Sequence, residues 1–469
     1  MLACLGSFAA SAQIQNFQHV VVIFQENRTP DNLFQGLCMV PFGSPEACST
    51  SPNASQYNIQ MRDWLDRHSA TGVTQPAAVA LDNNYDLSHA HTAFLVQCDK
   101  DKITGACKMD GAGDVACSGQ CPPRPQFRYV TDRKGTLTPY LQLATQYGWA
   151  NYMFQTNQGP SFPAHQFIFG GTSAPSAADD AAGIYASENM SGGTIAGCTA
   201  TTGTTVALVG PSGETQKVYP CFEHSTMADL FTAAGIAWRY YAPSAGSIWT
   251  APNAINHICQ STGPGGKCAG SDFSANVDLR PANVLTDIAG CKLRPLSWVI
   301  PSGANSDHAN SNDAGGPSWV ASIVNAVGAS STCDNNQGYW KNTAIVITWD
   351  DWGGWYDHER PTVLAQPQGD YQYGFRVPLI FVSAYTPAHY INNARHDFGS
   401  ILRFLEHNFG IQEGALNFAD NRAQNDLTGF YNLASPPRAF QTIPAPKSAE
   451  FFIRDKRRAT DPDDDGDDR

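Results

Sequence analysis

The chain has 469 residues, of which 42% are apolar and 15% are charged, and its formal net charge is −13. The apolar fraction is sufficient for a large buried core, and no apolar run reaches the roughly 20 residues that a membrane-spanning helix needs. The acidic charge argues against a nucleic-acid partner, because phosphate contacts require clustered Lys and Arg side chains. It leaves room for a phosphate ester substrate, provided that a cation or a local pocket supplies positive charge.

The cysteines and the first residues indicate an oxidising compartment. Residues 1–12 resemble the end of a signal peptide, because an apolar stretch is followed by an Ala-Ser-Ala cleavage pattern before Gln13. Removing these residues takes Cys4 from the 13 cysteines and leaves an even number, which predicts six disulfides. We therefore expect a secreted or periplasmic protein. Zinc is the less favoured interpretation of the four cysteines within residues 98–121, because no matching His pair follows them.

Strand-like and helix-like segments alternate along the chain. A β-branched run at residues 19–24 predicts a buried strand. A capped helix is expected to begin at Ser225 or Thr226 and to stop at Gly235. Further strands are expected at residues 238–241, 296–301, 344–348 and 376–384, and further helices at 316–330 and 397–410. This alternation predicts an α/β fold with a mostly parallel central sheet flanked by helices on both faces.

Insertions rich in Gly, Ser and Cys separate these elements. They lie at about residues 36–60, 97–125, 172–222 and 244–292. None shows a periodic core of its own, so we interpret them as disulfide-tied loops within one catalytic domain over residues 13–445. The charged segment 446–469, which ends in DPDDDGDDR, is expected to be a solvated and disordered tail.

Two of the predicted strands end in carboxylates. The stretch AIVITWDDWGGWYDHE, residues 344–359, places Asp350 and Asp351 at the carboxyl end of a strand, where open α/β sheets bind their ligands. Glu26 and Asn27 follow the first strand in the same way. Adjacent carboxylates repel each other unless a cation or a shared proton lies between them, which predicts a metal site. The alternatives are an ordinary acidic turn for the aspartates and a helix cap for Asn27.

A third segment, TNQGPSFPAHQFIFGGTSAP at residues 156–175, offers a nucleophile. Ser161 stands among Gly and Pro residues, which can hold a hydroxyl on a tight, exposed turn, and either a helix or a strand follows it. Taken by itself, the segment is better explained as an ordinary Pro-rich loop.

Taken together, these segments resemble the bacterial phosphoesterase family that contains phospholipases C of the phosphatidylcholine and sphingomyelin type and related acid phosphatases. The matching motifs, in the family's order and spacing, are VVVIFQENRTPDNLFQG, NQGPSFPAHQFIFGG, AIVITWDDWGGWYDH, and YGFRVPLIFVSAY followed by DFGSILRFLEHNFG. The resemblance runs from about His19 to Leu427. It implies an alkaline-phosphatase-like fold and a divalent metal ion, of unknown identity, in a hard, oxygen-ligated site.

The resemblance also implies roles for individual residues. The residues that match the family's metal site are Glu26, Asn27, Ser161, Asp350 and Asp351. Ser161 also stands where the family keeps its nucleophilic hydroxyl. Three histidines match active-site positions, namely His89, His308 and His358, although His308 precedes Ala309 where relatives often have Pro. A surface position is the alternative for His89. The histidines interpreted as structural or solvated are His165, His224, His257 and His407.

This set of residues predicts hydrolysis of a phosphate ester. A cation between the acidic residues would bind a phosphoryl oxygen and lower the pKa of the Ser161 hydroxyl, and a histidine would protonate the leaving oxygen. The leading interpretation is a secreted acid-phosphatase-type phosphomonoesterase that forms a phosphoserine intermediate, because position 161 is Ser and the last helix reads HDFGSILRFLE. A phospholipase C is the alternative, and a non-catalytic binding protein on the same fold is the least favoured interpretation.

Overall fold

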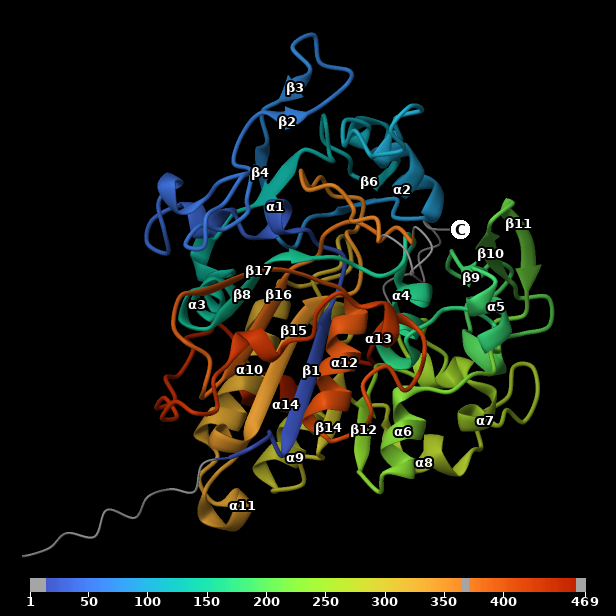
Figure 1. Cartoon of the computed structure of the whole chain (residues 1–469), viewed down its shortest axis with the longest axis vertical. Helices are drawn as coiled ribbons and strands as arrows, with labels where there is room; N and C mark the ends of the chain where they lie inside the picture. The colour runs from blue at the N-terminus through green and yellow to red at the C-terminus, as the bar shows by residue number, and fades with distance from the viewer. Residues whose placement is uncertain (1–13, 365–370, 461–469) are drawn as a thin grey trace, which may run out of the picture.

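The computed structural model describes residues 14–364 and 371–460, and its centre is an eight-stranded sheet (Figure 1). In spatial order the strands are β13 (Val277–Asp278), β12 (Trp238–Tyr241), β14 (Leu296–Val299), β1 (His19–Gln25), β15 (Thr343–Trp349), β16 (Leu379–Ser383), β8 (Gly148–Met153) and β17 (Tyr390–His396). Strand β16 runs antiparallel to both of its neighbours, and the other adjacent strands pair in parallel. The predicted mostly parallel sheet is therefore confirmed.

The central strands are formed by the most apolar runs of the sequence. Every residue of β1 and of β15 is buried, and both strands are rich in Val and Ile. Such strands suit the middle of a sheet that is covered on both faces, because both of their side-chain rows enter a core. The expected strands within 19–24, 238–241, 296–301, 344–348 and 376–384 are all present.

Helices cover both faces of the sheet. One group packs together on one face and consists of α3 (Thr138–Gln146), α9 (Asn283–Ala289), α10 (Gly316–Ala329) and α14 (Ala449–Arg454). The other group consists of α4 (Ser161–Gly170), α6 (Met227–Ala233), α12 (Phe398–Asn408) and α13 (Ala419–Arg422), and Figure 1 shows α12 running alongside β1, where Phe398 meets Phe24. Helix α6 begins after Thr226, whose side chain forms a capping box with Asp229, so the predicted cap is confirmed.

The insertions add short elements around the central sheet. Near the carboxyl end of β1 lie α1 (Pro30–Leu33), β2 (Trp64–Leu65), β3 (Val73–Thr74), β4 (Ala77–Val79), β5 (Tyr85–Leu87), α2 (His91–Cys98), β6 (Cys117–Gly119) and β7 (Arg128–Val130) (Figure 1). A separate three-stranded sheet contains β9 (Tyr185–Ala186), β10 (Val206–Gly210) and β11 (Gly213–Val218). The remaining α-helices of the described residues are short, namely α5 (Ala177–Ala181), α7 (Asn256–Cys259), α8 (Ser271–Asn276) and α11 (Cys333–Asn336).

Six disulfides tie these insertions and their flanks. They join Cys38 to Cys48, Cys98 to Cys107, Cys117 to Cys121, Cys198 to Cys221, Cys259 to Cys268, and Cys291 to Cys333. The predicted number of disulfides is confirmed, and the four cysteines within residues 98–121 are bonded in pairs. The small sheet of β9, β10 and β11 was not expected, because β11 is mostly exposed and carries polar residues without apolar alternation.

The C-terminal segment differs in part from the expected tail. Within residues 446–469, α14 is helical and Phe452 is only 1% exposed, where its ring meets Trp319 of α10. The run AEFFIR packs an apolar side chain into the core, although the many charged residues around it favour a solvated segment. Residues 461–469 and the predicted signal-peptide remnant 1–12 lie outside the described residues. Across the described residues, none of the helices has the length and apolar character needed to cross a bilayer.

Candidate active site

The register of the sheet brings the two acidic strand ends together. Strands β1 and β15 pair in parallel with Gln25 opposite Trp349, so Glu26 and Asp350 leave the sheet side by side. The ligand atoms of Glu26, Asp350 and His165 all lie within 4.8 Å of one another. All three side chains are completely buried. The strands therefore bring Glu26 and Asp350 together at this edge of the sheet, as their positions in the sequence predicted.

His165 comes from the helix that carries the proposed nucleophile. Its Nε2 lies 3.4 Å from Glu26 Oε1 and 3.7 Å from Asp350 Oδ2. Helix α4 begins at Ser161, so His165 is four residues further on and occupies the same face of the helix. The sequence predicts only a structural or solvated role for His165, and the burial of its ring against two carboxylates rules out the solvated one. The i, i+4 spacing from Ser161 was the signal that would have found it.

Asn27 links Asp350 to His89. Its backbone N–H donates to Asp350 Oδ1 at 3.0 Å, and its side-chain Nδ2 lies 2.9 Å from His89 Nε2. The His89 Nδ1 lies 2.9 Å from the Leu87 carbonyl oxygen and must donate to it, so Nε2 accepts from Asn27. This arrangement leaves Asn27 Oδ1 buried and without a hydrogen-bond partner among the described residues.

The backbone at Asn27 also excludes the alternative role considered for it. Its φ of 61° places it in the left-handed region, and Thr29 provides the side-chain cap of α1. Gly353 approaches so closely that a Cβ there would lie 2.4 Å from the Asn27 carbonyl oxygen. Asn27 is therefore not a helix cap, and the turn after Asp351 needs a glycine to pack against it.

Ser161 is the first residue of α4 and is completely buried. Its Oγ donates to Asp351 Oδ2 at 3.3 Å, and Asp351 Oδ1 accepts the Gly353 N–H at 2.7 Å. The next N–H of the helix, that of Phe162, donates to Asn189 Oδ1 at 2.9 Å. The hydroxyl thus lies between a carboxylate and a helix N-terminus, where a phosphoryl group is favoured electrostatically.

The charge balance of this cluster favours a cation. Burial raises the pKa of the Asp350 carboxyl, but a hydrogen bond with Glu26, the nearby His165, and hydrogen bonds with Ser161 and the Asn27 N–H outweigh it and hold the pKa below its ordinary range. Two buried carboxyl groups held this close together are a typical place for a metal ion, because a cation attracts both.

The donor set fits a divalent metal. Oxygen atoms from Glu26, Asn27, Asp350 and Asp351, with the Ser161 hydroxyl beside them, are ligands of a hard cation, and the His165 nitrogen would also suit a transition metal. The buried Asn27 Oδ1, which has no hydrogen-bond partner in the described chain, supports the fit. We name the six residues Glu26, Asn27, Ser161, His165, Asp350 and Asp351 the catalytic cluster, after the role that we propose for them below.

Two of the predicted histidines adjoin the catalytic cluster. The rings of His89 and His308 lie 5.7 Å apart, and His89 contacts Asn27. His308 follows β14, is 3% exposed, and donates from Nδ1 to the Ala309 carbonyl oxygen at 2.7 Å, with Nε2 3.9 Å from Asp86. His89 is buried, so the alternative surface position is wrong.

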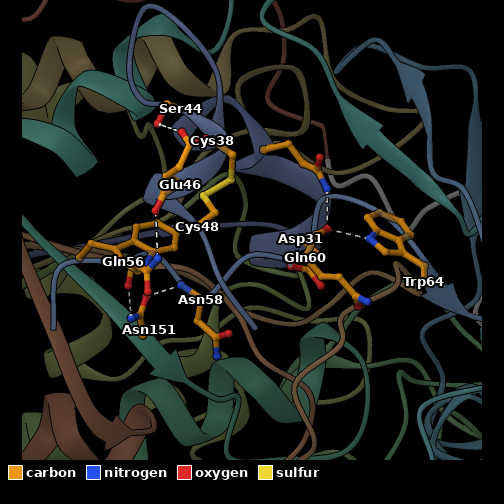
Figure 2. The surroundings of a disulfide bond; sticks show 12 residues. Asp31, Cys38, Ser44, Glu46, Cys48, Gln56, Asn58, Gln60, Trp64 and Asn151 are labelled. Carbon is orange, nitrogen blue, oxygen red and sulfur yellow. Dashed lines mark hydrogen bonds between the residues drawn. A yellow bond between two sulfur atoms is a disulfide. The ribbon is translucent and has the colours of Figure 1, made fainter. Parts of the chain in front are cut away.

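His358 lies in a second buried cluster. Its Nδ1 is 2.7 Å from Asp31 Oδ2 and its Nε2 is 2.9 Å from Asn58 Oδ1. Arg376 binds Asp357 with two nitrogens at 3.0 and 2.9 Å and lies 3.5 Å from Asp31. We name Asp31, Asp357, His358 and Arg376 the arginine cluster. Figure 2 shows Asp31 and Asn58 in the surroundings of the Cys38–Cys48 disulfide.

Both ring nitrogens of His358 are engaged within this network, so the structure does not bring His358 together with Ser161. Its catalytic role remains a prediction. Burial raises the pKa of Asp357 to about 6, while the neighbouring His358 and Arg376 overcome the effect of burial on Asp31 and lower its pKa.

Comparisons with known proteins show the family to which the chain belongs. The profile of the Phosphoesterase family matches residues 17–412. The chain is similar to hemolytic phospholipase C of Pseudomonas aeruginosa, with 22% identity over 89% of this chain and 56% of that protein. It is also similar to phospholipase C A of Mycobacterium tuberculosis, with 22% identity over 92% of this chain and 81% of that protein.

Among solved structures, a protein in the alkaline phosphatase superfamily from Vibrio parahaemolyticus aligns with 58% of this chain and 60% of its own, at 14% identity and a TM-score of 0.32. The chain spans little more than half the length of the Pseudomonas relative.

Proposed function

Because the chain belongs to the Phosphoesterase family, we propose that it is a metal-dependent phosphoric ester hydrolase in which Ser161 is the nucleophile. The observation that carries the proposal is the catalytic cluster itself. It contains a buried hydroxyl, that of Ser161, which donates a hydrogen bond to the Asp351 carboxylate. It also contains the two acidic strand ends and the Asn27 side-chain oxygen, which lacks a hydrogen-bond partner within the described chain. A non-catalytic binding protein would have no need of this combination.

The chain's own residues would carry most of the reaction. Asp351 accepts the Ser161 hydroxyl proton as Oγ attacks phosphorus, and the N-terminus of α4 stabilises charge on the phosphoryl oxygens. Attack forms a phosphoserine and expels the alcohol, and water then releases phosphate or a phosphomonoester and restores Ser161. A divalent metal bound by Glu26, Asn27, Asp350 and Asp351 would supply Lewis-acid stabilisation of the developing charge.

The histidines next to this cluster differ in what they can do. His89 holds Asn27 in place through a neutral Nε2, so we assign it a positioning role. His308 donates from Nδ1 to a backbone carbonyl, and its Nε2 lies 3.9 Å from Asp86. We propose His308 as the group that protonates the leaving oxygen, since imidazole titrates near neutral pH.

We further propose that the substrate is a phosphodiester of the phospholipase C type. The relatives named above are phospholipases C, which supports this proposal. The phosphatase interpretation depends only on the serine at position 161 and on the sequence of the last helix. Six disulfides support a location outside the cytoplasm, in the periplasm or the medium. The tail 446–469, apart from α14, and the single domain over 13–445 also remain proposals.

The test compares two soluble substrates on the oxidised protein supplied with a divalent metal. Hydrolysis of p-nitrophenyl phosphorylcholine is expected to exceed that of p-nitrophenyl phosphate, and Ser161→Ala is expected to lower kcat by about 10³-fold or more. The matched control is Ser322→Ala, which removes a buried hydroxyl from α10 on the other face of the sheet.

Each result has one meaning. Preference for the monoester would return the assignment to the phosphatase, with Ser161 unaffected. Full activity of Ser161→Ala, together with no phosphoenzyme after acid quench, would refute the serine mechanism.

A further inference from the structure

A third group of metal-ligating side chains lies outside both named clusters. It consists of His91, the first residue of α2, Glu188, which follows β9, and Glu214 of β11. One ligand atom from each lies within 4.8 Å of the other two. The residues come from three different segments, so only the tertiary structure brings them together.

The spacing between His91 and Glu214 suits a shared cation better than a hydrogen bond. His91 Nδ1 lies 3.5 Å from Glu214 Oε2, whereas N–H···O bonds are usually about 2.9–3.0 Å long. Two ligands bound tetrahedrally to zinc, each at about 2.0–2.1 Å, stand roughly 3.4 Å apart. The observed distance matches that of a ligand pair on one ion. His91 is only 6% exposed, so its ring has little freedom to leave this position.

Both carboxylates are oriented by hydrogen bonds from neighbouring groups. Glu188 Oε1 accepts the backbone N–H of His91 at 3.0 Å, and Glu214 Oε1 accepts the Ser187 hydroxyl at 2.7 Å. Outer contacts of this kind hold metal ligands in a binding geometry before the ion arrives. The group therefore has built-in supports in addition to its three ligands.

Cavities adjoin the group on two sides. Glu188 and Glu214 line a cavity of about 490 Å³, and His91 lines a smaller one of about 170 Å³ together with Asn157. Asn157 is 6% exposed, and its buried Oδ1 lacks a hydrogen-bond partner within the described part of the chain. An acceptor oxygen in that condition points to a ligand that can satisfy it, such as a cation or its bound water.

We propose that His91, Glu188 and Glu214 bind a second divalent cation of the zinc class. An imidazole and two carboxylates form a donor set that suits such an ion, and the adjoining cavities leave room for water or substrate in an open position. The site is close to the catalytic cluster along the chain. His91 follows His89 by two residues, and Asn189, next to Glu188, holds the first turn of α4.

The experiment measures zinc stoichiometry by equilibrium dialysis of the full, oxidised, metal-stripped chain. His91→Ala and Glu214→Gln are each expected to bind one zinc fewer than the parent chain. Ser187→Ala, which removes only the hydroxyl that orients Glu214, is expected to keep the stoichiometry and weaken one site about 10–100-fold. Glu46→Gln is the matched control, because Glu46 is an exposed glutamate bonded to Ser44 beside the Cys38–Cys48 disulfide (Figure 2).

The measurement is repeated in the Ser161→Ala chain, so that it does not depend on catalysis. Loss of one equivalent there as well would support the second site even if the proposed hydrolase activity failed. Unchanged zinc binding in both His91→Ala and Glu214→Gln would overturn the proposal and leave an ion pair only. Circular dichroism of each variant checks that it is folded. Of the two ligand substitutions, Glu214→Gln disturbs the core least, because Glu214 lies at the surface of β11.

Discussion

The catalytic cluster and the arginine cluster are both buried and rich in carboxylates, but they obtain positive charge differently. In the arginine cluster, the guanidinium of Arg376 binds Asp357 with two nitrogens, and its remaining nitrogen donates to the carbonyl oxygens of Asn58 and Asn151. In the catalytic cluster, the ionisable base beside Glu26 and Asp350 is the imidazole of His165. One cluster is complete within the chain, and the other is suited to receive charge from outside.

This difference distinguishes carboxylates that are paired within the fold from carboxylates that can bind an added cation. A buried carboxylate whose partner is an arginine of the same chain is neutralised permanently, and removing the partner leaves an unpaired charge. Neighbouring buried carboxylates that have no arginine partner can instead be neutralised by a metal ion. His358 is the instructive residue, because sequence resemblance grouped it with the catalytic residues while its contacts belong to the arginine cluster.

The largest effect is expected from Asp350→Asn. It should lower kcat with any phosphate ester by about 10³-fold or more and abolish the rise in Tm that a divalent metal gives the parent chain. Without metal, the variant should be close to the parent in stability, because an amide oxygen can still accept the Asn27 N–H and the lost attraction to His165 is offset by the lost repulsion from Glu26. Calorimetry with and without metal measures both effects. A metal-free variant much less stable than the parent would contradict the comparison of the two clusters.

Arg376→Met should act through stability. It leaves Asp31 and Asp357 without their guanidinium and is expected to cost about 3–5 kcal/mol of unfolding free energy, with or without metal. Urea unfolding provides the measurement. Arg280→Met removes an exposed arginine and should remain within about 0.5 kcal/mol of the parent. Equal effects of the two substitutions would show that the arginine cluster does not hold the fold.

His165→Ala tests whether His165, for which the sequence predicts no catalytic role, contributes to metal binding. Loss of an imidazole next to Glu26 and Asp350 should weaken metal binding by about 10–100-fold, with activity recovering at high metal concentration. His224→Ala is the matched control, since His224 is also buried on the same side of the sheet but donates to the Ser225 carbonyl. A metal titration of activity in both variants decides whether His165 belongs to the site.

The smallest effect concerns a carboxyl group outside both clusters. Burial and the nearby Asp420 raise the pKa of Glu406 to about 8. An unfolded glutamate titrates near 4.3, so between about pH 5 and 8 the folded chain keeps a proton that the unfolded chain has lost. Stability should therefore fall as pH rises through this range, and Glu406→Gln should make that fall shallower. Melting curves at pH 5, 6.5 and 8 measure the slope, and an unchanged slope would contradict the assignment.

Local sequence was sufficient for the elements with strong patterns. The Val- and Ile-rich runs identified β1 and β15, and the Thr226 cap identified α6, because apolar periodicity and capping act within a few residues. Strand β8 was missed, since GWANYM contains no β-branched residue, and β17 was missed because its polar residues are tolerated at the edge of the sheet.

The sequence by itself determined that acidic residues follow two buried strands and that a serine is framed by Gly and Pro. Only the tertiary structure decided which side chains meet. The register of β1 on β15 sets Glu26 beside Asp350, the first turn of α4 places His165 on the same face as Ser161, and the turn after β15 brings His358 to Asp31. Such contacts depend on pairings between residues far apart in the chain, and no local preference encodes which distant partner a buried polar group will find.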